Sequence, residues 1–107
     1  MEIELLKKTY LPMTETAFYI LLSLNKSRHG YGIIQHVEEL TNGRIKLGPG
    51  TIYGTLSKLE KEGLIIPETE EDRRKVYRLN NKGRQVLKLE IERLLELLNN
   101  GKREMEG

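Results

Sequence analysis

Residues 48–63 read GPGTIYGTLSKLEKEG, and residues 64–79 continue as LIIPETEEDRRKVYRL. The first stretch predicts a helix that begins at Pro49, because proline in the first helical turn loses no hydrogen bond and presets φ. Gly63 marks where this helix ends. Apolar residues recur at helical spacing between these two points, at Ile52, Leu56 and Leu59. The residues between them are polar or small, so the helix is expected to have one buried face and one exposed face.

The second stretch predicts a β-hairpin. An apolar run begins a strand at residues 64–66, and the charged residues 70–73 form a turn. Residues 75–79 then alternate polar and apolar side chains, which is typical of a half-buried returning strand. A helix followed directly by a hairpin is the arrangement found at the end of a winged helix-turn-helix.

The residues before this stretch predict two shorter helices. Thr14 is a good N-cap for a strongly apolar helix from Glu15 to about residue 25, and residues 27–30 read as a turn. A second helix should run over about 31–40 and stop at Asn42-Gly43. Alternation of apolar and basic residues at 44–47 favours one short strand around Ile45 and Leu47.

The residues after the hairpin predict a last helix. Asn80 or Asn81 would cap it, and it should run from about residue 82 to about residue 99, before a frayed tail that begins near Gly101. The expected fold is therefore mostly α with a small β-hairpin: a winged helix-turn-helix plus a C-terminal dimerisation helix. We expect residues 1–80 to form the winged helix domain, with residues 1–12 contributing to a dimer, and residues 81–107 to form the dimerisation helix and tail.

Length and composition limit the classes of protein that are compatible with this chain. At 107 residues it is expected to form a single domain. The sequence contains no Cys, which excludes disulfides and thiolate metal sites. Two histidines without a matching carboxylate pattern do not predict a metal site, and no motif indicates a cofactor. No apolar run is long enough for a signal peptide or a membrane span, so the expected location is the cytoplasm.

Charge is distributed unevenly along the chain. The net charge is only +2, but residues 41–85 hold ten basic and six acidic side chains, a local excess of +4. A basic middle beside acidic flanks indicates one positively charged surface.

The outward face of the 49–62 helix is the first candidate for that surface. Small residues let a helix approach the floor of the major groove, while hydroxyls and lysines reach phosphates and base edges. The candidate contacts are Thr51, Tyr53, Gly54, Ser57, Lys58 and Lys61. Read in isolation, the same pattern would also fit an ordinary solvated amphipathic helix.

The hairpin carries the second candidate, a cluster of three cations at Arg73, Arg74 and Lys75. Side chains of this kind on a wing lie along a phosphate backbone or enter the minor groove. Charges on an edge strand also protect it from aggregation, and the two roles are compatible. A basic wing that follows a basic helix predicts binding of double-stranded DNA better than either feature alone.

The last helix carries more apolar surface than a small domain can cover. We expect a second copy of the chain to bury this stripe, although the helix could also fold back on its own domain. The candidate seam residues are Leu5, Leu6, Leu87, Ile91, Leu94, Leu95 and Leu98.

The chain resembles the PadR-like family of transcriptional regulators, in particular the short subfamily with a single C-terminal helix. Four stretches carry the resemblance, and together they cover nearly the whole chain. They are residues 11–21 (LPMTETAFYIL), residues 29–33 (HGYGI), residues 50–53 (GTIY) with Leu56, Leu59, Glu60, Gly63, Leu64 and Ile65, and residues 73–79 (RRKVYRL) with Gly83.

The resemblance implies a homodimeric repressor that binds an inverted repeat. It implies that Thr51, Tyr53 and Lys58 contact DNA from the recognition helix and that Arg73, Arg74 and Lys75 form the wing. Many members respond to small aromatic or cationic compounds or to phenolic acids, so a small-molecule effector is compatible with the resemblance. Some short members bind flat drugs against a tryptophan, and this sequence has no Trp.

Two other classes of function fit the sequence less well. No Ser/His/Asp set, paired-acid site or phosphate-binding glycine loop is present, so the sequence does not predict an enzyme. A winged helix can also serve as a protein-interaction module that never touches DNA. The basic wing and the small residues on the helix face argue against that alternative, and a strong fall of nucleic-acid affinity with salt would separate the two.

Overall fold

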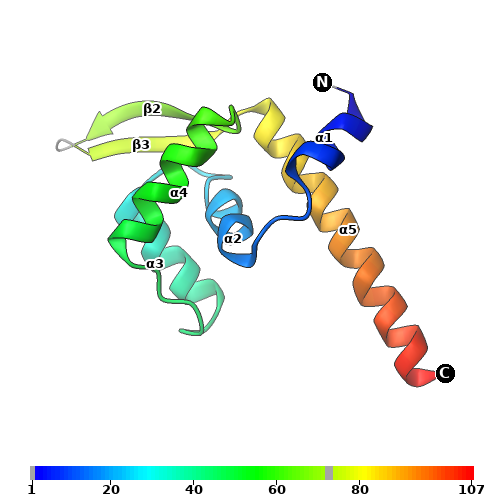
Figure 1. Ribbon diagram of the computed structural model, residues 1–107. Coiled ribbons are helices and arrows are strands. Elements are labelled where there is room, and N and C mark those ends of the chain that lie inside the picture. Colours follow the sequence, from blue (N-terminus) through cyan, green and yellow to red (C-terminus); the bar gives the residue numbers. More distant parts are fainter. Residues whose placement is uncertain (1, 72–73) are drawn as a thin grey trace.

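The computed structural model describes residues 2–71 and 74–107, and these residues form a mostly helical fold with one small sheet (Figure 1). The helices are α1 (Ile3–Tyr10), α2 (Glu15–Ser23), α3 (Gly30–Leu40), α4 (Pro49–Lys61) and α5 (Asn81–Glu106). The strands are β1 (Arg28–His29), β2 (Ile65–Glu71) and β3 (Arg74–Leu79). The elements that precede α5 are called the head below. The arrangement confirms the expected winged helix-turn-helix with a long C-terminal helix.

The sheet is antiparallel, with strand order β1–β3–β2. In the hairpin, Ile65 pairs with Leu79 and Glu71 with Arg74, with an irregularity in register between Pro67 and Thr69. Figure 1 shows this hairpin projecting from the head beside α4. The strand pairing therefore presents the hairpin as a wing next to the helix that precedes it.

The core lies under α2, as its apolar sequence predicts. Ile20, Leu21 and Leu24 of this helix region are fully buried. They pack in one cluster with apolar residues from every other helix and from the hairpin, including Leu6, Ile33, Val37, Ile52, Leu56, Leu59, Leu64, Ile65, Leu79, Val86 and Leu87. Because α4 buries its complete apolar stripe in this cluster, its other face remains free for contacts outside the chain.

Local capping explains where the functional elements begin. Helix α4 begins at Pro49, and the preceding residue, Gly48, provides no side-chain cap. Gly63 takes a left-handed φ of 75°, a conformation that other residues adopt at a cost, and so turns the chain from α4 into β2. The Asn80 Oδ1 atom accepts a hydrogen bond from the Gly83 backbone N–H at 2.7 Å, which caps α5.

The strand predicted around Ile45 and Leu47 is wrong. Residues 44–48 form an irregular connection, and the short strand lies instead at Arg28–His29, which the sequence suggested was a turn. Ile45 and Leu47 alternate with basic residues because both pack against the core from this connection. The two residues of β1 pair with Tyr77 and Val76 of β3, so their conformation depends on partners far along the chain.

The two ends of the chain also differ from expectation. Residues 3–10 form a helix, α1, which the sequence analysis did not predict, and its Leu6 is fully buried against the core. At the other end, the predicted frayed tail is helical, because α5 continues through Gly101 to Glu106. Figure 1 shows α1 against the first half of α5 and the second half of α5 running away from the head.

Candidate nucleic-acid interface

The outward face of α4 carries all six of the predicted helix contacts. In the structure each of them is exposed, namely Thr51, Tyr53, Gly54, Ser57, Lys58 and Lys61. A Cβ built on Gly54 would meet no atom within 4 Å, so the helix surface is open at that point. This face therefore has no side chain in its middle, at Gly54, and it carries lysines toward the C-terminal end of the helix.

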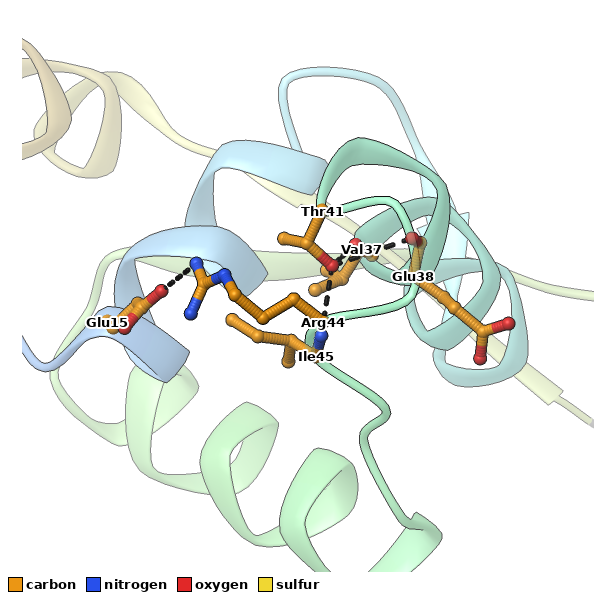
Figure 2. A network of polar contacts seen from close by, with 6 residues as sticks. All are labelled: Glu15, Val37, Glu38, Thr41, Arg44 and Ile45. Atoms are coloured by element: carbon orange, nitrogen blue, oxygen red, sulfur yellow. Dashed lines mark hydrogen bonds and ion pairs between the residues drawn. The ribbon is translucent and has the colours of Figure 1, made fainter.

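The connection between α3 and α4 is held by the polar network in Figure 2. The Thr41 hydroxyl donates to the Val37 carbonyl at 2.8 Å and accepts from the Ile45 backbone N–H at 3.0 Å. Arg44 forms an ion pair with Glu15 at the start of α2. These contacts tie the residues that lead into α4 to both preceding helices, so they help to set the orientation of α4 on the head.

The wing contributes two of the three predicted cations. Arg74 and Lys75 are exposed on β3. Arg73 lies outside the described residues. On the same strand, Arg78 lies 3.6 Å from a carboxylate oxygen of Glu68 on β2, an exposed ion pair that links the two strands.

Helix α4 and the wing meet at one groove of about 460 Å³. Side chains from both elements line this groove, including Tyr53 and Ser57 from α4 and Arg74 and Lys75 from β3. Two members of each predicted set, more than ten residues apart in the sequence, are thus brought to one surface. Thr51 and Lys58 instead line a second hollow, beside residues of α1 and α2. The sequence analysis did not predict Glu60, which also lines the groove and places one carboxylate beside the cations.

Tyr53 is positioned by the start of α3. A Cβ built on Gly30 would lie 2.9 Å from the Tyr53 Cε1 atom, so the ring can rest there only because residue 30 has no side chain. Tyr53 nevertheless remains 53% exposed. The glycine in the stretch His29-Gly30-Tyr31-Gly32 therefore helps to seat an aromatic ring at the edge of the groove.

The predicted seam residues divide into two groups. Leu6 and Leu87 are buried in the chain's own core. Large apolar residues remain exposed on α1 and on α5, at Leu5, Ile91, Leu94, Leu95 and Leu98. Leu97 and Met105, which the sequence analysis did not place in the seam, are exposed as well. Past Glu90, the large apolar residues of α5 are all exposed, although Leu94 also lines a hollow beside Phe18 of α2.

Glu90 is a buried acid that the sequence analysis read only as part of an acidic flank. Its side chain is 1% exposed and accepts a hydrogen bond from the Met13 backbone N–H at 2.8 Å. Arg93 donates to both carboxylate oxygens, at 2.5 Å and 3.0 Å. Burial by itself would raise the pKa of Glu90, but the bonds from Arg93 and Met13 outweigh it and lower that pKa below its usual value. The signal was its spacing of four from buried Val86.

Within the part of the chain that the structure describes, no group of three or more His, Asp or Glu side chains could hold a metal ion. Among the same residues, no helix combines the length and apolar character needed to cross a membrane.

Comparison with known proteins identifies the family. The model of the transcriptional regulator PadR-like family matches residues 20–89, well over half of the chain. The transcriptional regulator YqjI of Escherichia coli K12 is 41% identical over 59 residues, which are 55% of this chain and 28% of that protein. An uncharacterized 37.1 kDa protein in transposon Tn4556 of Streptomyces fradiae is 36% identical over 69 residues, 64% of this chain and 19% of that protein. The chain thus spans less than a third of the length of either relative.

Solved structures agree with this assignment. A PadR-like transcription factor from Bacteroides fragilis has a TM-score of 0.66 at 29% identity, covering 84% of this chain and 88% of that one. A transcriptional regulator from Clostridium thermocellum has a TM-score of 0.69 at 26% identity, covering 82% and 89%. A PadR family regulator from Clostridium difficile R20291, at 24% identity, shares the fold with a TM-score of 0.70, covering 88% and 100%. The chain belongs to the PadR-like family of transcriptional regulators, which are not enzymes.

Proposed function

We propose that the protein is a homodimeric repressor that binds an inverted-repeat operator. In this proposal α4 enters the major groove and the β2–β3 hairpin lies on the adjacent backbone. The observation that carries the proposal is the shared groove, where Tyr53 and Ser57 of α4 face the same space as Arg74 and Lys75 of the wing. Such a surface can read base edges and hold phosphates at the same time.

Helix α4 is suited to the reading role. Thr51 and Ser57 offer hydroxyls, and Lys58 and Lys61 offer cations, on a face that the chain leaves uncovered. The open surface at Gly54 allows the helix backbone to come close to the groove floor. Contacts of this kind to base edges contribute about 1–3 kcal/mol of discrimination each.

The wing is suited to fixing the register. Arg74 and Lys75 lie where β3 pairs with β2 alone, directly before Val76 and Tyr77, where β3 also pairs with β1. Arg73 belongs to the same proposal on the basis of the sequence alone. Because phosphate contacts carry no sequence information, removal of these cations should weaken binding to all DNA sequences alike.

The dimer is proposed to form through α5. The seam consists of Ile91, Leu94, Leu95 and Leu98, with Leu5 of α1 beside it, all exposed in the single chain. Leu6 and Leu87 support the seam indirectly, because they attach α1 and α5 to the core of their own chain. A two-fold seam places two α4 helices about one turn of DNA apart, about 34 Å, which is the spacing of a palindromic operator.

Regulation and location follow from the same arrangement. A small-molecule effector bound at the dimer seam would change the spacing between the two α4 helices and so release the operator. A repressor acts on DNA inside the cell, so we propose a cytoplasmic location.

The test is a binding titration followed by fluorescence anisotropy. The full chain is titrated against the DNA upstream of its own gene and against duplexes selected from a random library, each at several salt concentrations, with scrambled duplexes as controls. We expect a selected inverted repeat, at least about a thousandfold preference over scrambled DNA and a steep fall of affinity with salt. Weak and equal binding to all duplexes would refute the proposal and favour a winged helix that binds a protein.

A further inference from the structure

We propose that Glu90 is a positioning residue: its contact with Met13 sets the angle between α5 and the head, and through that angle the distance between the two α4 helices of a dimer. This inference rests on the proposed function, since it assumes that α5 forms the seam and that α4 reads DNA. It assigns a DNA-spacing role to a side chain that touches neither DNA nor the partner.

The first support is the completeness of the contact. Both carboxylate oxygens of Glu90 have partners, one from the Met13 backbone N–H and the others from the Arg93 guanidinium. A buried carboxylate is costly unless it is paired and hydrogen-bonded in this way. Met13 lies between α1 and α2, so the bond joins α5 to a segment 77 residues away in the chain.

The second support is the place of Glu90 along α5. The first turns of this helix are anchored in the core by Gly83, Val86 and Leu87, and Glu90 is the last buried residue of the helix. A helix that is attached to the rest of the chain at two separated points has a fixed direction. From Glu90 to Glu106 the helix extends 16 residues, about 24 Å, so a rotation of about 10° at this point would move the far end by about 4 Å.

The third support is that packing beside this attachment is only partial. A hollow of about 400 Å³ adjoins the contact between α1 and α5, lined by Leu11, Pro12 and Arg93 among others. A second hollow of about 300 Å³ is lined by Met13, Phe18 and Glu90 among others. Leu11 and Met13 are only partly buried where they pack against the core, so the polar contact adds a directed attachment to that packing.

The fourth support is a continuous route from Met13 to α4. The next residue, Thr14, caps α2 by accepting the Ala17 backbone N–H at 3.1 Å. Glu15 then pairs with Arg44 in the connection that leads into α4 (Figure 2). The same short segment thus contacts α5 through Met13 and the α4 connection through Glu15, which gives a route from Glu90 toward α4.

The decisive experiment compares Glu90→Gln with Glu92→Gln on operators of different spacing. The first variant keeps the size of the side chain but replaces one acceptor oxygen with an NH2 donor, so it cannot accept from Met13 and from both Arg93 nitrogens as the carboxylate does. The control makes the same chemical change at an exposed residue two positions along the same helix. Spacers between the two half-sites are lengthened or shortened by one base pair, which moves the half-sites by about 3.4 Å and rotates them by about 35°.

We expect the wild type and Glu92→Gln to prefer one spacer over its neighbours by about tenfold or more, and Glu90→Gln to reduce that preference to about threefold or less. A variant that was merely less stable would lose affinity for all spacers equally. If the wild type shows no operator preference, the proposed function fails and the inference falls with it. If the wild type prefers one spacer and Glu90→Gln has the same preference, the inference alone is overturned.

A second measurement follows the angle directly and needs no DNA. The chain has no native Cys, so spin labels can be placed only at Glu38→Cys on α3 and Asn100→Cys on α5. Labelled chains are diluted into unlabelled protein, so that distances within one chain are recorded. Glu90→Gln should shift or broaden the distance distribution by about 4 Å, the lever estimate, while Glu92→Gln should not. Identical distributions in all three proteins would overturn the inference.

Discussion

Helices α4 and α5 are both amphipathic, but they differ in how much of their apolar surface the chain buries. In α4 the whole apolar stripe, Ile52, Leu56 and Leu59, is buried by the chain itself. In α5 the same kind of stripe is buried only in its first turns, and from Ile91 onward it is exposed. The outer face of α4 is thus a polar surface on a helix whose apolar stripe is completely buried. The second half of α5 instead leaves its apolar side chains exposed. The outer face of α4 suits a polar, charged partner, and the exposed half of α5 suits the same helix of a second chain.

The largest expected effect follows from Ile91→Glu, which places a charge on the exposed stripe of α5. A two-fold seam would contain this glutamate twice and leave it unpaired, so we expect the dissociation constant of the dimer to rise at least about a thousandfold, about 4 kcal/mol. Sedimentation velocity measures the change. Gln85→Glu, at an exposed position away from the stripe, is the control. A variant that remains dimeric at micromolar concentration would show that the seam lies elsewhere.

The next effect concerns the buried beginning of α5. A Cβ on Gly83 would lie 2.0 Å from the Leu64 carbonyl oxygen, whereas one on Gly101 would meet no atom within 4 Å. Gly83→Ala should therefore lower the free energy of unfolding by about 3 kcal/mol through overpacking. Gly101→Ala should raise it by about 1 kcal/mol through helix propensity. Urea denaturation at one fixed protein concentration compares them, and equal effects would contradict the division of α5 into a buried and a free half.

A smaller effect is expected for Arg74→Ala on the wing. Loss of one phosphate contact should weaken binding to operator and scrambled DNA alike by about 1 kcal/mol and reduce the salt slope by about one. Anisotropy titrations at several salt concentrations give both quantities. Lys8→Ala on α1, away from the hairpin in Figure 1, removes the same charge and should change neither. A loss confined to the operator would mean that Arg74 reads bases instead of phosphates.

The smallest effect separates stability from binding on α4. Gly54→Ala should raise the free energy of unfolding by up to about 1 kcal/mol, because the added Cβ meets nothing within the chain and alanine favours the helix. The same methyl group should lower operator affinity, since it holds the helix away from the groove floor. Calorimetry and anisotropy test the two halves of this prediction. Gly101→Ala should stabilise without a loss of affinity, and a Gly54→Ala variant that binds as tightly as the wild type would remove Gly54 from the interface.

Much of the head was readable from the sequence because its signals are local. Pro49 and Gly63 bound α4, Asn80 caps α5, and the alternation at residues 75–79 marks β3, as the structure confirms. Helix α1 also has a local signal in the sequence. Ile3, Leu6 and Tyr10 follow helical spacing, with an acid in the first turn and two bases in the last.

Other features had no local signal. The two residues of β1 form a strand only because β3 lies beside them, and no alternation exists in so short a segment. Leu6 and Leu87 look like seam residues in the sequence, since burial in the own core and burial in a dimer favour the same residue type. The proposed division between a winged helix domain and a dimerisation helix is harder to draw in three dimensions, because Val86 and Leu87 of α5 belong to the core of the head.

The sequence by itself determined the helix-and-hairpin order, the basic face of α4 and the excess of apolar surface on α5, because each depends on residues within about two helical turns of one another. The tertiary structure alone decided that helix and wing share one groove, that β1 completes the sheet, and that Glu90 holds Met13. Those outcomes require contacts between segments that lie tens of residues apart, and such contacts exist only once the core has brought the segments together.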